Sequence, residues 1–138
     1  MQQFRWTRAK SVFVPEFDAE HRNLYQIADG LHKASSAGAT PDTLVPAVRA
    51  LLDAAEDHFA HEERMMRAAR YPLLDWHKRQ HDTARKAVTA RLARMEAGDA
   101  LAPQELLDFL AEWLKDHLAV TDRMMSATIR AYTRAHAA

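Results

Sequence analysis

The chain has 138 residues, about the size of one domain. Nineteen Lys and Arg residues balance nineteen Asp and Glu residues, so the zero net charge provides no overall attraction to nucleic acid or to an anionic membrane. The absence of cysteine excludes disulfides, iron–sulfur clusters and thiol catalysis, and the presence of only three glycines excludes a glycine-rich phosphate loop. The composition predicts a small helical protein, and its most unusual feature is the presence of eight histidines.

The N-terminal segment, residues 1–17, is predicted to form an extended arm. It mixes aromatic and β-branched residues, and Pro15 keeps it out of a helix interior. It has no long apolar stretch of the kind found in a secretory signal, and no run in the chain reaches the ~18 apolar residues that a membrane span needs. We therefore expect a cytoplasmic protein with neither a membrane nor a nucleic acid as its partner.

Prolines, glycines and turn residues divide the rest of the chain into four helical stretches. The first begins near Asp18, a good N-cap residue, and ends before Gly38. The four predicted ranges are 18–36, 42–69, 72–97 and 103–132. Short connections between helices of this length predict an all-α, up-down-up-down four-helix bundle with the arm at its N-terminus. We expect the whole chain, residues 1–138, to form this one domain.

The apolar stripes of these helices include several polar residues. Those that follow the 3- and 4-residue spacing of a buried face are His21, His58, Glu62, His77, His81 and His117. A single histidine on such a face is more often a hydrogen-bonded core residue than a ligand. Together these residues would bury many polar atoms, each costing about 1–3 kcal/mol if left unpaired. Metal coordination would remove that cost, so the pattern predicts a metal site inside the bundle.

The spacing within each helix supports this interpretation. His58 and Glu62 are four residues apart, as are His77 and His81, so each pair projects from one face one turn apart. Asp122 follows His117 by five residues, and a regular α-helix would rotate the two by about 140° relative to each other. A π-type turn or a local bend between them would aim both at the core, and such turns occur preferentially at functional sites.

The candidate ligands occur in a distinctive order along the chain. A lone histidine is followed by H-x-x-x-E, H-x-x-x-H and H-x-x-x-x-D. The lone histidine ends Asp18-Ala19-Glu20-His21, and the second motif lies in His58-Phe59-Ala60-His61-Glu62-Glu63-Arg64-Met65-Met66. The third is His77 and His81 after Tyr71-Pro72, and the fourth is Trp113-Leu114-Lys115-Asp116-His117 with Asp122. This order resembles the hemerythrin signature, and Phe4-Arg5-Trp6 and Val14-Pro15 resemble the arm of bacterial hemerythrins. The resemblance covers nearly the whole chain, and every ligand position holds the expected residue type.

The resemblance implies a non-haem centre of two iron ions joined by an oxide or hydroxide bridge. Seven residues would supply the ligands: His77, His81 and His117 on one iron, His21 and His58 on the other, and Glu62 and Asp122 bridging the two. With about six positions on each iron, these ligands and the bridge leave one position open, on the iron with two histidines. The family binds O2 at that position. By the same resemblance, the candidates for the O2 pocket are Leu24, Phe59, Trp113, Leu114 and Leu118.

The remaining histidines are predicted to lie outside the centre. His61 is expected to be solvated, His32 lies about 16 Å along the helix axis from His21, and His136 belongs to the C-terminal tail. The methionine pairs, Met65-Met66 and Met124-Met125, are expected to fill the core. A solvated face is the expected place of Arg64, Arg67 and Arg70.

These features favour reversible O2 binding for storage, transport or sensing over an enzymatic function. Five imidazoles and only two carboxylates would stabilise high-valent iron less than the carboxylate-rich sites of ferritin-like bundles do. Two alternatives stay open at this point. One is a di-iron oxidase, peroxidase or nitric-oxide-handling enzyme, and the other is an iron-handling or signalling module. The sequence leaves the oligomeric state open, a monomer included.

Overall fold

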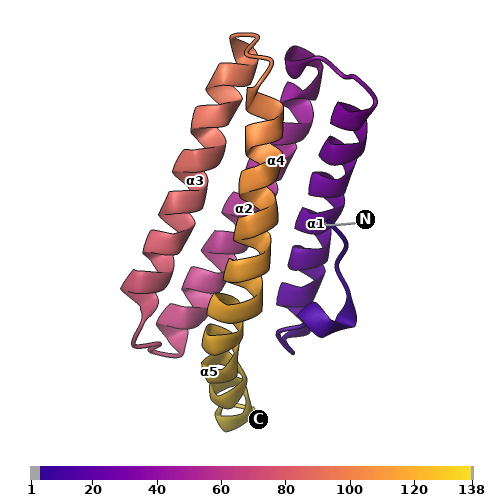
Figure 1. The fold of residues 1–138 in the computed structure, drawn as a ribbon. Coiled ribbons are helices and arrows are strands. Elements are labelled where there is room, and N and C mark those ends of the chain that lie inside the picture. The colour runs from indigo at the N-terminus through magenta and orange to yellow at the C-terminus, as the bar shows by residue number, and fades with distance from the viewer. Residues whose placement is uncertain (1–3, 138) are drawn as a thin grey trace.

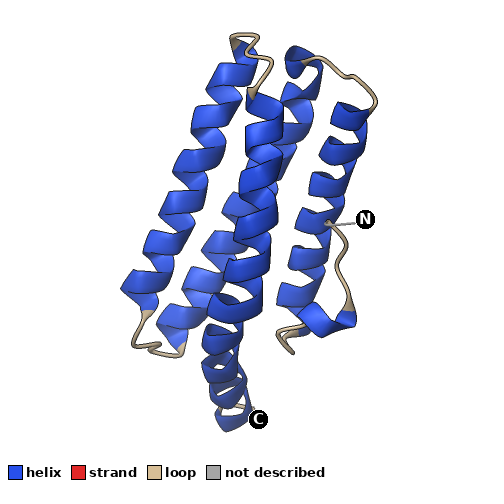
Figure 2. Cartoon of the chain, viewed as in Figure 1, coloured by secondary structure: helices blue, strands red, loops and turns tan. Residues whose placement is uncertain are grey.

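The structure, a computed structural model, describes residues 4–137, so the first three residues of the predicted arm lie outside the described part. It is a bundle of four long helices running up, down, up and down, with no strand between residues 4 and 137 (Figure 1, Figure 2). Its helical elements are α1 Pro15–Ser36, α2 Pro41–Ala68, α3 Leu74–Glu96, α4 Ala102–Trp113, the π-helix η2 Leu114–Thr121 and α5 Asp122–Ala135. The predicted fold class is confirmed. The fourth helix of the bundle is the continuous run of α4, η2 and α5.

The start of α1 differs from the prediction. The helix begins at Pro15, which suits a first helical position because its missing N–H would have no intrahelical partner there. Asp18 is therefore inside the helix and is not its N-cap. Its carboxylate instead accepts hydrogen bonds from the Ser11 hydroxyl at 2.6 Å and from the Val12 backbone N–H at 2.9 Å. Asp18 thus fastens the arm to α1.

The connections between helices are short. Gly38 and Gly98 have φ angles of 94° and 83°, a left-handed conformation that favours glycine and ends α1 and α3. At the opposite end of the bundle α2 is closed by Arg70, with φ 56°, and the Tyr71 N–H donates to the Met66 carbonyl. Consequently α3 begins at Leu74, two residues later than the start predicted at residue 72. None of the described helices is long and apolar enough to cross a membrane.

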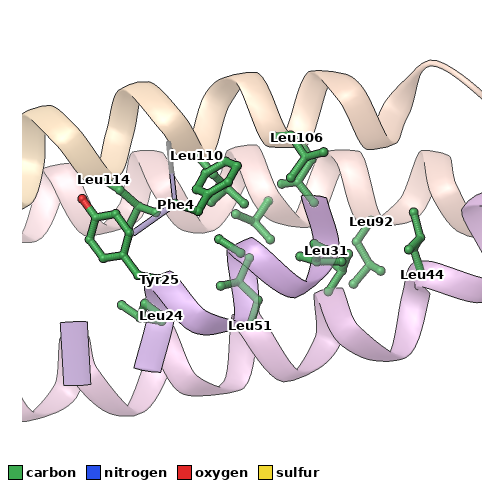
Figure 3. Packing of buried hydrophobic residues seen from close by; sticks show 14 of the residues in the cluster. Phe4, Leu24, Tyr25, Leu31, Leu44, Leu51, Leu92, Leu106, Leu110 and Leu114 are labelled. Atoms are coloured by element: carbon green, nitrogen blue, oxygen red, sulfur yellow. The ribbon is translucent and has the colours of Figure 1, made fainter. Parts of the chain in front are cut away.

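The buried apolar residues form two separate clusters. The larger one is rich in leucine and occupies the half of the bundle towards Gly38 and Gly98 (Figure 3). The smaller one, at the other end, joins the arm to α1, α2 and α5 through Val12, Val14, Phe17, Met66, Tyr71, Met125 and Ile129. On α1, His21 lies between Phe17 of the smaller cluster and Leu24 of the larger one. The other candidate ligands lie at the same level of the bundle: His58 and Glu62, His77 and His81, and His117 and Asp122.

Candidate metal centre

All seven residues predicted as ligands are buried in one layer of the bundle. Their relative exposures are between 0% and 3%. The structure brings them together as two overlapping groups, in which one ligand atom from each residue lies within 4.8 Å of all the others. The first group is Glu62, His77, His81, His117 and Asp122, and the second is His21, His58, Glu62 and Asp122. The two groups therefore share both carboxylates and divide the five histidines three to two.

The π-helix explains how the fourth helix contributes two of these residues. In η2 the backbone is wound more widely than in an α-helix, which brings residues five apart onto one face. His117 Nε2 consequently lies 3.0 Å from Asp122 Oδ1, and both side chains point into the bundle. Of the two possibilities predicted from the His117–Asp122 spacing, a π-type turn or a local bend, the structure contains the π-type turn.

The imidazole Nε2 atoms converge on the two carboxylates. Asp122 has His77 Nε2 at 3.1 Å from Oδ1 and His21 Nε2 at 3.1 Å from Oδ2. Glu62 Oε1 has three such neighbours, at 3.0, 3.4 and 3.6 Å, which are the Nε2 atoms of His81, His58 and His77. Taken together, the imidazole nitrogens around the two carboxylates come from α1, α2, α3 and η2.

Many of these close atoms form no hydrogen bond. The atoms without a partner include His77 Nε2, His117 Nε2, Glu62 Oε2 and both carboxylate oxygens of Asp122, although several lie about 3 Å from one another. These atoms are close enough for hydrogen bonds, but the angles between them do not suit hydrogen bonding. Orphaned buried polar atoms are costly, and imidazole nitrogen with carboxylate oxygen is a donor set that suits transition-metal ions. The residues present therefore fit a bound pair of cations.

A second layer of carboxylates orients two of the histidines. His58 Nδ1–H donates to Glu20 Oε1 at 2.5 Å, and His81 Nδ1–H donates to Glu63 Oε2 at 2.9 Å. A hydrogen bond on Nδ1 fixes the tautomer and leaves Nε2 free for a metal ion. The spacing pattern within each helix does not reveal this role of Glu20 and Glu63. The signal that could have found them is their position next to candidate ligands, because Glu20 directly precedes His21 and Glu63 directly follows Glu62.

His61 also belongs to this second layer. Its Nδ1–H donates to Glu20 Oε2 at 2.6 Å, and its side chain is only 25% exposed. His61 thus lies outside the ligand groups and reaches the surface, as predicted, but its ring is only partly solvated because Glu20 bridges His61 and His58. His32 and His136 lie outside the two ligand groups, as predicted. They pack instead against Phe4 and Tyr132.

Burial and the nearby charges shift the pKa values of the metal-free site in opposite directions. Burial, reinforced by Asp122, raises the pKa of Glu62 well above its usual value. Burial opposes ionisation of Asp122 as well, but His117, His21 and His77 outweigh it and hold the pKa of this carboxyl well below its usual value.

The pKa values of two histidines of the site are also shifted in opposite directions. Burial alone would lower the pKa of His77, but Asp122 and Glu62 outweigh it and raise the pKa to about 9. Burial, together with His77 and His117, lowers the pKa of His81 to about 2. Without a metal ion a proton on His77 therefore compensates the ionised Asp122, and a bound cation would replace that proton.

Apolar side chains cover one side of the centre. Phe59 stacks on His81 with ring centres 4.0 Å apart, and Trp113 stacks on His117 at 4.4 Å. A cavity of about 20 Å³ beside them is lined by apolar side chains and by Arg85. Four of the predicted pocket residues are among those that line it, namely Leu24, Phe59, Trp113 and Leu114. Such a cavity admits about one water-sized molecule, and apolar walls keep it dry.

Leu118, the fifth predicted pocket residue, does not line this cavity. It is buried in the leucine-rich cluster that also contains Leu24 and Leu114. Of the methionines expected in the core, Met66 and Met125 are fully buried, but Met124 is 47% exposed. The prediction for Met124 is wrong, because this side chain lies on the solvent side of α5 while Met125 and Ile129 face the core.

Comparisons with known proteins agree with the geometry. The sequence profile of the hemerythrin HHE cation binding domain matches residues 12–129. A bacteriohemerythrin of Ralstonia nicotianae is 30% identical over 91% of this chain and 88% of its own length. A myohemerythrin of Theromyzon tessulatum is 29% identical over 88% of this chain and 89% of its own length. A solved mutant protein shares the fold with a TM-score of 0.82, at 24% identity over 90% of this chain and 95% of its own. The chain belongs to the hemerythrin family.

Proposed function

We propose that the protein binds O2 reversibly at a centre of two iron ions held by the seven buried residues. The observation that carries this proposal is the pair of ligand groups that share Glu62 and Asp122. Two shared carboxylates with three histidines on one side and two on the other suit a bridged pair of ions with unequal coordination. The choice of iron and of O2 rests on family membership, because the relatives are named bacteriohemerythrin and myohemerythrin.

In this proposal each ligand has a defined place. One iron is held by His77, His81 and His117, and the other by His21 and His58, while Glu62 and Asp122 bridge the two. When bound, the iron pair supplies the redox chemistry and the open coordination position that reversible O2 binding requires. The protein supplies neutral imidazoles in excess of carboxylates, which favours binding of O2 over oxidation of a substrate. Glu20 and Glu63 hold two of these imidazoles in the required tautomer.

The apolar residues would control what reaches the centre. The cavity of about 20 Å³ lined by Leu24, Phe59, Trp113 and Leu114 is large enough for a diatomic molecule and too small for an organic substrate. This size supports a carrier or sensor of a small ligand rather than an enzyme that transforms a larger one. We place Leu118 beside this pocket as well, because it is buried in the same cluster next to His117 in the chain. A dry pocket also excludes the protons that would promote irreversible loss of reduced O2.

Metal content and absorbance together test the proposal. The purified protein should hold about two irons per chain, as seven ligands with two shared carboxylates imply. Substituting His77→Ala or His117→Ala should lower the iron content, whereas His32→Ala and His136→Ala, matched changes outside the centre, should not. The reduced anaerobic protein should develop an absorption band in air and lose it when O2 is removed. A reconstituted protein that binds one ion or none, or a band that O2 removal leaves in place, would contradict the proposal.

A further inference from the structure

The zero net charge of the chain hides a separation of charge along the bundle. Between Glu96 and Glu112 the sequence has five acidic residues and no basic one, and this stretch forms the α3–α4 connection and most of α4. The residues 64–74 and 123–137 contain six arginines and no acidic residue. These two segments meet at the opposite end of the bundle, where α2 ends and α5 extends beyond the other helices (Figure 1).

The two ends also differ in how their charges are paired. At the acidic end, Arg94 forms ion pairs with Asp99 and Glu105, and Arg49 pairs with Glu96. At the basic end, none of the six arginines is paired with a carboxylate within residues 4–137; they are Arg64, Arg67, Arg70, Arg123, Arg130 and Arg134. The guanidinium groups of this end therefore have no carboxylate partner among the described residues, although Glu16 lies nearby, whereas much of the negative charge at the other end is paired within the chain.

Two of the basic-end arginines hold the arm in place. Arg123 Nε donates to the Ser11 carbonyl at 3.2 Å, and Arg130 Nη1 donates to the Val12 carbonyl at 2.8 Å. Arg134 lies eleven residues after Arg123, on the same stripe of α5. A carbonyl accepts a hydrogen bond but carries no net charge, so these contacts position the guanidinium groups without cancelling them.

A surface groove of about 540 Å³ lies between the arm, α2 and α5 at this basic end. The apolar side chains Val14, Met65 and Ile129 line it, and Arg130 and Arg134 contribute positive charge on the α5 side. An apolar lining with charged residues around it is the anatomy of a protein–protein interface.

Phe13 stands exposed at the groove in a strained conformation. Its φ is 62°, a left-handed value that is unfavourable for a bulky residue, and its side chain is 63% exposed. The Phe13 N–H donates to the Ser11 hydroxyl oxygen, which itself donates to Asp18, so the turn is held in this shape. The Arg130 guanidinium lies 5.5 Å from the Phe13 ring centre. Exposed aromatic and arginine side chains held together are typical of interface hot spots, and strain of this kind tends to be retained at binding sites.

We propose that this groove docks an acidic segment of a partner protein. An apolar side chain of the partner enters the groove beside Phe13, and its carboxylates meet Arg130, Arg134 and the arginines at the end of α2. The groove is concave and apolar at its centre, which suits a side chain better than a bilayer or a phosphodiester backbone. A second copy of the chain is a poorer fit, because carboxylates of its acidic end are already paired with Arg49 and Arg94.

The groove also reaches the candidate metal centre. His61 lines it, and the hydrogen bonds from His61 to Glu20 and from His58 to Glu20 join the groove to a candidate ligand. A docked partner is therefore connected to the centre through one carboxylate. Docking itself requires neither iron nor O2, so the test below is independent of the proposed O2 binding.

Fluorescence anisotropy of labelled peptides tests the proposal with the full-length protein as isolated. The probe is a peptide of glutamates with one central phenylalanine. This probe should bind the parent protein, and its affinity should fall as the salt concentration rises towards about 0.15 M. Its affinity for the double variant Arg130→Gln/Arg134→Gln should be about tenfold lower than for the parent. The double variant Arg49→Gln/Arg94→Gln, the matched change at the acidic end, should bind as the parent does. Glu16→Gln should strengthen binding because Glu16 is the carboxylate that lines the groove.

Two further measurements separate the groove from simple charge attraction. A peptide of glutamates alone should bind about tenfold more weakly than the probe, because nothing fills the apolar centre. Phe13→Gly should weaken binding of the probe while leaving the protein as stable or more stable, since glycine relieves the backbone strain. The proposal is overturned if the probe fails to bind at low salt, or if it binds the Arg130/Arg134 variant like the parent. Tighter binding of duplex DNA or of phosphatidylglycerol vesicles would also overturn it, in favour of a nucleic acid or membrane partner.

Discussion

The two halves of the bundle bury different kinds of side chain. Towards Gly38 and Gly98 the core is made of leucines such as Leu31, Leu44 and Leu106, each less than 5% exposed (Figure 3). The buried polar and charged residues of the described chain all lie in the other half, at the level of the metal centre and the arm. Leucine packing stabilises the fold whether or not metal is present, whereas the polar half leaves atoms unpaired until a cation binds them. The stability of one half thus permits the polar chemistry of the other.

Removal of the metal should produce the largest difference between the halves. Ions that bind only the folded state stabilise it by about 4 kcal/mol when they are present at 1,000 times their dissociation constant. The chelator-treated protein should therefore unfold at a lower temperature in circular dichroism, and added iron should restore the midpoint. Hydrogen exchange should rise around η2 and much less around Leu31 and Leu106. Equal midpoints with and without metal would mean that the site is not coupled to folding.

Shortening a leucine in each half should give similar stability losses with different functional results. Leu106→Ala and Leu118→Ala should each cost about 2–5 kcal/mol, because both side chains are buried. Because Leu118 and Leu114 lie beside the centre, the variants Leu118→Ala and Leu114→Ala should also shorten the lifetime of the O2-bound absorption band in air. Leu106→Ala, the control in the leucine-rich half, should leave that lifetime unchanged. Equal decay in the three variants and the parent would show that these leucines do not protect bound O2.

The sequence predicts the fold and the clustering of the candidate ligands because both depend on helical periodicity. The spacing of His58 and Glu62 fixes their common face in any α-helix, and the His117–Asp122 spacing predicts a π-type turn or a local bend, of which the structure contains the first. The arm contact of Asp18 was missed for a different reason. A good N-cap residue can bind any nearby donor, and only the folded path of the arm determines which donors it meets.

The second layer was also beyond the reach of sequence spacing. The hydrogen bond from His58 to Glu20 joins residues 38 positions apart on two helices. It depends on how α1 and α2 are rotated against each other, which no pattern within one helix specifies. The same reasoning explains why Leu118 does not line the cavity although it follows a candidate ligand. Its direction is set by the wider winding of η2.

Removing a second-layer carboxylate should have an intermediate effect. Glu20→Gln and Glu63→Gln keep the size of the side chain but lose the charge that orients His58 and His81. Such changes typically lower metal affinity by about 10–100-fold, equivalent to about 1.4–2.8 kcal/mol. Competition with a chromophoric chelator measures the affinity. Glu56→Gln, which removes only a surface pair with Arg85, is the matched control and should leave the affinity unchanged. Metal affinities equal to the parent in both variants would show that these carboxylates do not support the ligands.

The smallest effect should appear as a pH dependence of the metal-free protein. The pKa of His77 is raised to about 9, so its protonated form stabilises the folded state fully below the unfolded value of about 6.5. That stabilisation is lost as the pH rises towards 9. The raised pKa of Glu62 acts in the same direction. The pKa of His81 is lowered to about 2, so this residue destabilises the folded state only as the pH falls below about 6.5 and does not affect the higher range. The chelator-treated protein should therefore become less stable between pH 6.5 and 9.

The metal-bound protein should respond to pH in the opposite way. Imidazoles must be neutral to bind a metal ion, so acidification below about 6.5 should release iron and lower the stability, while a rise towards pH 9 should not. Urea unfolding at pH 6.5 and at pH 9, with and without chelator, measures both trends. His77→Gln should weaken the trend of the metal-free protein, because it removes the proton that compensates Asp122 and leaves only the contribution of Glu62. A metal-free protein whose stability is constant or increases over this range would contradict the view that a proton and a cation replace each other in the polar half of the bundle.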